Sequence, residues 1–131
     1  MFKSLCILFA AVIVVLCGAC RSTVENNNRT AVELCRYMMQ KTGGKFDGTM
    51  AVEPIHADDG FALKVANRQV AFYKFNMKYK KARAKIEFVD KNGFIYIYGF
   101  KFPAVSRGSF IMVDYEENPL KDQLLEAFNN F

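Results

Sequence analysis

The segment NGFIYIYGFKF, residues 92–102, alternates between aromatic and other side chains almost without a break. Successive side chains of a β-strand point to opposite faces, so its aromatic side chains would share one face of a sheet. These aromatic residues are Phe94, Tyr96, Tyr98, Phe100 and Phe102. Strict alternation of this kind is typical of a strand, and the chain must therefore build a sheet that can use such a row.

The turn before this strand decides which face the aromatic row occupies. Residues 84–89, AKIEFV, are interpreted as the partner strand, and residues 90–93, DKNG, as the turn. In a three-residue loop with the glycine left-handed, Phe88 pairs with Tyr96 and the row joins an apolar face. In a four-residue loop, Glu87 pairs with Tyr96, and the row becomes an exposed platform beside basic residues. The three-residue loop is the better-populated solution, so we expect the row to face the core.

Helix signals lie at both ends of the remaining chain. Thr30 and Glu33 form a capping box at the start of a helix, which the glycines at 43 and 44 end. Its expected apolar stripe is Ala31, Val32, Cys35, Met38 and Met39. Asn118 as N-cap and Pro119 at the first helical position begin a second helix near the C-terminus.

Further strands are predicted between the two helices. Residues 61–65 and 70–76 flank the turn ANRQ and indicate a hairpin, and residues 109–115 indicate another strand. Residues 49–55 are predicted to be a short edge strand, or a lead-in to a strand, that Pro54 stops. The prediction is an α+β fold: an N-terminal helix, an antiparallel meander of about five strands, and a C-terminal helix, with both helices on one face of the sheet.

The first residues of the chain have the pattern of an export signal. Lys3 is followed by an apolar run from Leu5 to Leu16 and then by small residues. The run is short for a membrane span, which needs about 20 apolar residues. We predict a signal peptide at residues 1–19; an uncleaved membrane anchor is the alternative.

The end of this signal, LCGAC, resembles the lipobox of bacterial lipoproteins. Gly18, Ala19 and Cys20 fit the lipobox, whereas Cys17 stands where the family usually has leucine. The resemblance covers only the signal, and it implies that Cys20 is lipidated and becomes the mature N-terminus. An aspartate after the lipidated cysteine commonly retains the family's members at the inner membrane. Arg21 stands there, which implies the outer membrane, facing the periplasm.

The lipobox also sets the expected domain organisation. Residues 20–29 are polar and are interpreted as a tether, and residues 30–131 as a single α+β domain. Ordinary cleavage after Ala19 is the alternative. It would give a freely secreted protein in which Cys20 and Cys35 could form a disulfide.

Few residues have the chemistry of a catalytic or metal site. Cys35 lies on the apolar stripe of its helix and is expected to be a buried thiol. His56 is the one histidine, and its neighbouring carboxylates lack the spacing of a metal site. The serines have no nucleophile-elbow context. We therefore expect no enzyme, no catalytic residue, no metal and no cofactor.

Basic charge is the strongest functional signal in the mature chain. Residues 74–107 carry nine basic and two acidic side chains, a net charge of +7, whereas residues 114–131 carry a net charge of −4. The densest part is KYKKARAK, residues 78–85. The candidate residues for an anionic partner are Lys78, Lys80, Lys81, Arg83 and Lys85. A solvated connection between strands is the plainer interpretation of the same residues.

The export signal makes nucleic acid an unsuitable partner, so the expected partners are an anionic envelope polymer or an acidic protein, together with the membrane that holds the lipid. The expected function is that of a non-enzymatic cell-envelope lipoprotein that binds or scaffolds an envelope component. The alternative is a secreted or tethered inhibitor or immunity-type protein that blocks an enzyme.

Overall fold

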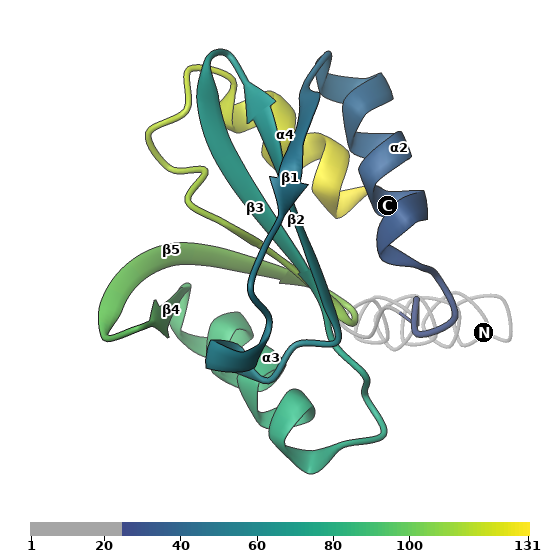
Figure 1. Cartoon of the computed structure of the whole chain (residues 1–131), viewed down its shortest axis with the longest axis vertical. Helices are drawn as coiled ribbons and strands as arrows, with labels where there is room; N and C mark the ends of the chain where they lie inside the picture. Colours follow the sequence, from purple (N-terminus) through teal and green to yellow (C-terminus); the bar gives the residue numbers. More distant parts are fainter. Residues whose placement is uncertain (1–24) are drawn as a thin grey trace, which may run out of the picture.

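The computed structural model describes residues 25–131, so the expected signal peptide and Cys20 lie outside the described residues. Three α-helices, one 3-10 turn and one six-stranded antiparallel sheet make up this part (Figure 1). The elements in chain order are α2 (Ala31–Thr42), β1 (Lys45–Thr49), η2 (Glu53–Ile55), β2 (Asp59–Val65), β3 (Arg68–Lys74), α3 (Lys80–Asn92), β4 (Phe94–Ile97), β5 (Phe100–Arg107), β6 (Phe110–Val113) and α4 (Lys121–Asn129). The α+β class is confirmed, with six strands instead of about five.

The sheet consists of two three-stranded meanders, and not of the single meander that we expected. Its strand order is β1-β2-β3-β6-β5-β4, and α3 carries the chain from β3 at the centre to β4 at the far edge. The two meanders join where β3 pairs with β6, with Ala71 opposite Val113 and Lys74 opposite Phe110. Both strands are apolar on both faces, as a strand with helices above and below must be.

Helices cover both faces of the sheet (Figure 1). On one face, α2 and α4 pack against alternate residues of β2, β3 and β6, including Leu63, Phe72 and Met112. On the other face, α3 packs against the intervening residues, including Tyr73 and Ile111. The central strands therefore belong to two hydrophobic cores at once, because successive side chains enter different layers.

The predicted strand at residues 84–89 is wrong, because these residues lie within α3. Ala82, Ile86 and Val89 are buried, and their spacing of four and three residues places them on one side of a helix. Gly93 ends the helix in a left-handed conformation (φ 76°), which is the usual helix terminator and not the hairpin bulge that we expected.

The expectation that the whole aromatic row faces the core is also wrong, although Phe102 does pack against the core that contains Ile95. The chain folds back at Tyr98 and Gly99, whose φ values of 51° and 80° are those of a two-residue hairpin turn, so the row is divided between β4 and β5. Ile95, from the opposite set, is the fully buried residue at 1% exposure, whereas Tyr98 and Phe100 are 75% and 70% exposed. The predicted pairing of residues 84–89 with the aromatic row is wrong because residues 84–89 form part of a helix and not a strand.

The N-terminal helix begins as predicted. The Thr30 side chain accepts a hydrogen bond from the backbone N–H of Glu33 (3.1 Å), and the Glu33 carboxylate accepts one from the backbone N–H of Thr30 (3.3 Å). The helix ends before Gly43, which is left-handed. Its buried side is rotated from the expected stripe, since Val32 is exposed. The buried residues are Ala31, Leu34, Met38 and Thr42.

The C-terminal helix begins two residues later than the predicted cap allows. Asn118 is buried, and its side chain accepts from the N–H of Leu120 (2.9 Å) and donates to the carbonyl of Val65 (2.9 Å). The asparagine thus holds the turn before α4 against the end of β2, and α4 starts at Lys121.

Candidate anion-binding surface

Three of the five candidate bases are exposed together at the start of α3. Lys78 lies in the connection from β3, and Lys80 and Lys81 are the first two helical residues. Arg83 is exposed as well, but it turns back along the helix, and its Nη1 donates to the carbonyls of Met77 (2.9 Å) and Lys78 (3.0 Å). The guanidinium therefore closes the loop that presents the lysines.

Lys85 lies one turn beyond Lys81 along the same side of α3. It is half-buried, whereas Lys80 and Lys81 are exposed. The structure thus separates the five bases into the exposed trio Lys78, Lys80 and Lys81, the loop-closing Arg83, and Lys85 farther along the helix.

The start of α3 is electropositive beyond its lysines. The N-cap residue, Tyr79, makes no side-chain cap, and the first turn contains no acidic residue. The N–H groups of a first helical turn have no partner within the helix and carry the positive end of its dipole. An acidic residue would normally stabilise this position. The lysines of the trio add to the positive potential instead.

None of the trio has an acidic partner among residues 25–131. The ion pairs in this part of the chain are Arg29–Glu33, Arg68–Glu117 and Lys121–Glu116, all away from α3. On α3 itself, Asp90 accepts a hydrogen bond from the Ser106 hydroxyl (3.3 Å). The basic charge at the helix start is thus exposed to solvent.

Aromatic side chains form a second exposed surface where α3 meets β4. Phe88 packs edge-on against Phe94 (ring centroids 5.3 Å apart), and Phe94 packs in the same way against Tyr96 (5.4 Å). The Lys101 ammonium lies 4.1 Å from the centre of the Phe94 ring, a cation–π contact. Lys85 precedes Phe88 by three residues, which places it beside this surface on the helix. The packing of α3 against the β4–β5 hairpin therefore brings aromatic and basic side chains together.

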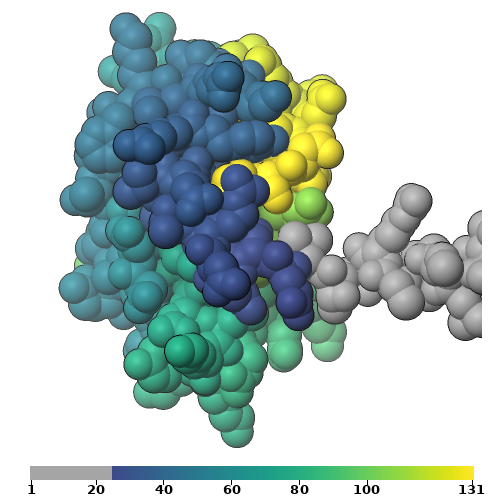
Figure 2. All heavy atoms as spheres, turned by 90° about the vertical axis from the view of Figure 1, so that its right-hand side faces the viewer, coloured from purple at the N-terminus to yellow at the C-terminus, as the bar shows by residue number. Residues whose placement is uncertain are grey.

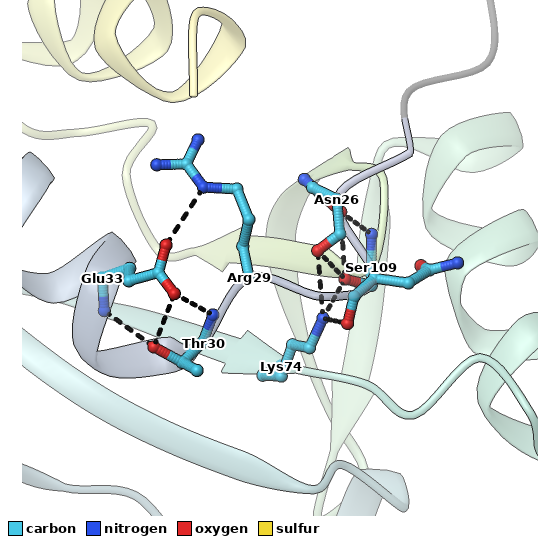
Figure 3. A network of polar contacts seen from close by, with 7 residues as sticks. Asn26, Arg29, Thr30, Glu33, Lys74 and Ser109 are labelled. Carbon is cyan, nitrogen blue, oxygen red and sulfur yellow. Dashed lines mark hydrogen bonds and ion pairs between the residues drawn. The ribbon is translucent and has the colours of Figure 1, made fainter.

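A buried polar cluster fastens the start of the described chain to the sheet (Figure 3). We call Asn26, Lys74 and Ser109 the Asn26 clamp. The Asn26 carboxamide oxygen accepts from the N–H (2.8 Å) and the hydroxyl (3.0 Å) of Ser109, and its amide donates to the carbonyl of Arg107 (2.9 Å). Lys74 Nζ donates to the carbonyls of Asn26 (3.3 Å) and Asn27 (3.1 Å) and to the Ser109 hydroxyl.

The turn between β5 and β6 is shaped to receive this clamp. Gly108 has a φ of 59°, and a Cβ atom there would lie 2.2 Å from the Asn26 carboxamide oxygen. Only glycine leaves room for Asn26, whose side chain reaches a position 83 residues away in the sequence.

Lys74 and Ser109 are residue types that form nucleophilic pairs in some hydrolases, but here they are enclosed. Burial lowers the pKa of Lys74, with nearby carboxylates opposing the shift. Ser109 is 0% exposed, and Asn26 covers its hydroxyl. A nucleophile must reach its substrate, so this arrangement serves to hold the chain in place.

The clamp includes a residue of the predicted tether. Residues 20–29 were expected to be a polar tether, yet Asn26 is 4% exposed and belongs to the packed domain. Arg29 is also held, since its guanidinium lies 3.6 Å from the centre of the Phe131 ring and its Nε lies 3.4 Å from the Glu33 carboxylate. Asn26 and Arg29, which lie within the predicted tether, therefore pack against the rest of the described chain.

A polar hollow of about 410 Å³ lies between the clamp and the start of α3. Asn27 and Asn28 line one side of it, and residues 74–78 with Asp58 line the other. The segment that leads into the domain and the loop that carries Lys78 thus lie next to each other.

The other candidate residues are not gathered into a site. Cys35 is half-buried in an apolar hollow of about 400 Å³ between α2 and the strands β1 and β2, and burial raises the pKa of its thiol. His56 is exposed and left-handed (φ 58°) at the end of η2. Across residues 25–131, no three histidine, cysteine or acidic side chains converge as metal ligands would.

Sequence reasoning missed the Asn26 clamp entirely. The run of three asparagines looked like tether, and Ser109 like an ordinary strand start. Gly108 before a predicted strand was the one available hint, because a glycine often marks a close backbone approach.

None of the helices in the described part of the chain has both the length and the apolar character to cross a membrane. Comparisons of the chain with models of protein families, with curated proteins and with solved structures found no match in any of the three.

Proposed function

We propose that this protein is a non-enzymatic cell-envelope lipoprotein, anchored through Cys20 at the outer membrane and facing the periplasm. It binds an anionic envelope component through the start of α3. The observation that carries the proposal is the exposed trio Lys78, Lys80 and Lys81 on an uncapped helix start, with no acidic partner among the described residues.

The energetics of α3 support a binding role for these lysines. Basic residues in the first turn oppose the helix dipole, and Lys81 and Lys85 are like charges four residues apart. Each of these features costs stability, so the simple role of a solvated connection does not explain them. Residues that lower stability without a structural benefit are candidates for binding residues.

The five candidate bases then have different roles. Lys78, Lys80 and Lys81 contact the anion directly, and Lys85 extends the charge towards the aromatic surface around Phe94. Arg83 positions the loop, because its two hydrogen bonds to backbone carbonyls occupy one end of its guanidinium.

An inhibitor or immunity-type protein is the second candidate, and the β4–β5 hairpin favours it. Tyr98 and Phe100 are 75% and 70% exposed at the tip of this hairpin. Exposed aromatic residues are typical anchors of protein interfaces, and a partner enzyme would have to be acidic to suit the basic α3.

The test of the proposal separates charge from anchoring. In a Cys20→Ser background, which removes the lipid, we expect the protein to remain with envelope material at about 0.01 M salt, where charge attraction reaches about 30 Å and is strong enough without a tether. We expect about 0.5 M NaCl to release it, because salt screens exposed charge pairs. Adding Lys80→Glu and Lys81→Glu should release it without salt, as measured by the fraction of protein in the soluble extract.

The matched control is Lys45→Glu with Lys64→Glu. These two exposed lysines face each other across β1 and β2, so the control makes the same change in net charge elsewhere. Equal release by both pairs would show that only total charge matters, and would contradict a binding site at α3. Release as a stoichiometric complex with one acidic protein would favour the inhibitor.

A further inference from the structure

We infer that the anionic partner of the α3 lysines is the headgroup layer of the membrane that holds the lipid on Cys20, and that the Asn26 clamp enforces this contact. The inference rests on the proposed anchor. It goes beyond the proposed function by naming the partner and by giving the clamp the task of orienting the domain.

The clamp leaves only a short linker between the lipid and the domain. Residues 21–25 are the only ones between Cys20 and Asn26. A fully extended chain spans at most about 3.6 Å per residue, so residue 26 lies within roughly 22 Å of the lipidated cysteine. Without the clamp, the linker would include residues 26–29 as well, and the domain could turn freely.

The point at which the linker joins the domain lies beside the basic trio. Asn27 and Asn28 line the polar hollow together with Lys78, and Lys74 bonds to the carbonyl of Asn27. Figure 2 shows the first described residues, in purple, directly above the green surface that α3 and the connection before it form on this side of the molecule. A membrane within reach of residue 26 is therefore also within reach of the start of α3.

Electrostatics then fixes which side of the domain faces the membrane. Anionic headgroups attract basic residues next to a membrane, and the attraction falls off within about 8 Å at physiological salt. Only basic residues held within this distance of the headgroups are attracted to them. The trio meets this condition, whereas Lys45 and Lys64 lie near the β2–β3 turn, at the other end of β3 from Lys74 and the loop that leads to α3.

A soluble polyanion would also bind the trio, but its binding would not depend on the length of the linker. The membrane differs because it is joined covalently to the domain. A short linker raises the effective concentration of headgroups at the lysines, and a long flexible one lowers it. Linker length therefore separates the two sources of negative charge.

The experiment measures how fast each lysine is acetylated by a membrane-impermeant reagent. The lipidated protein is inserted from detergent into preformed vesicles of phosphatidylcholine alone or with phosphatidylglycerol. Mass spectrometry then reads each site. In the anionic vesicles we expect labelling of Lys78, Lys80 and Lys81 to slow by about threefold or more, with Lys45 and Lys64 unchanged. High salt should restore the faster labelling.

A second variant tests the linker itself. Insertion of about 20 glycine and serine residues between Glu25 and Asn26 keeps the clamp and the fold, and should abolish most of the protection. Protection that persists in this variant would overturn the inference, because the clamp and short linker would then be unnecessary.

Intact mass distinguishes failure of the membrane contact from failure of the proposed anchor. Acyl chains on Cys20 with equal labelling in both kinds of vesicle would overturn the inference and leave the proposed anchor in place. A mature protein without acyl chains would remove the anchor, and the inference with it.

Discussion

Asn26 shows how much one short polar side chain can do at the boundary of a domain. Its carboxamide uses both its oxygen and its nitrogen, and it joins the first described residues to the β5–β6 turn. Buried polar groups are stabilising only when each finds a partner, and this one does. The same bonds that secure the chain also determine where the linker leaves the domain.

We expect Asn26→Ala to lower the free energy of unfolding by about 2 kcal/mol, because it leaves the buried Ser109 N–H without its acceptor and removes the hydrogen bond to the Arg107 carbonyl. Urea denaturation followed by circular dichroism measures this change. Asn27→Ala is the matched control, since Asn27 is exposed and contributes its backbone carbonyl to Lys74. If the two variants were equally stable, the Asn26 side chain would not hold the clamp.

At the scale of elements, local signals predicted structure wherever the stabilising contacts are local. The Thr30–Glu33 capping box and the β2–β3 hairpin around Ala66 and Asn67 were found from sequence and are present. Each depends on residues only a few positions apart. The same is true of Gly93, which was recognised as left-handed although its helix was not.

The failure at α3 has an equally local cause. Residues 84–89 alternate in polarity, which indicated a strand, while Ala82, Ile86 and Val89 follow the helical period. Lysine, alanine and arginine at 80–85 favour a helix, and this propensity was given too little weight against the alternation. The clamp and the strand order could not be predicted in this way, because they depend on contacts between residues far apart.

The element α3 should become more stable when its first turn is made acidic. Lys80→Glu with Lys81→Glu removes two charges that oppose the helix dipole, so we expect the free energy of unfolding to rise by about 1 kcal/mol. Urea denaturation at low ionic strength measures the change. Lys45→Glu with Lys64→Glu replaces one like-charged pair by another and should leave stability nearly unchanged.

The double variant Lys80→Glu with Lys81→Glu is informative because it is expected to gain stability and to lose binding. A more stable protein that no longer associates with the envelope cannot have lost binding by unfolding. Loss of stability in the Lys80 and Lys81 variant would mean that these lysines support the fold, and the energetic argument for their binding role would fail.

At the scale of the whole molecule, the pairing of β3 with β6 links the two hydrophobic cores. Alternate residues of these strands face α2 and α4 on one side and α3 on the other. Neither meander has a complete core without the other, because each contributes one of the two central strands. The described domain should therefore unfold as one unit, and a cavity in either core should lower the free energy of unfolding of the whole domain.

Two large-to-small substitutions test this unity. Leu34→Ala removes a fully buried side chain from the core under α2, and Ile95→Ala removes one from the core under α3. Each should lower the free energy of unfolding by about 3 kcal/mol, because each leaves a cavity in close-packed surroundings. In both variants, urea unfolding followed by far-ultraviolet circular dichroism and by tyrosine fluorescence should give coincident transitions with an unchanged slope.

If Ile95→Ala instead split the transition, with α3 and the β4–β5 hairpin unfolding first, the domain would consist of two separable halves. The hairpin and the α3 lysines could then move independently of the clamp, and the clamp could no longer hold them against a membrane.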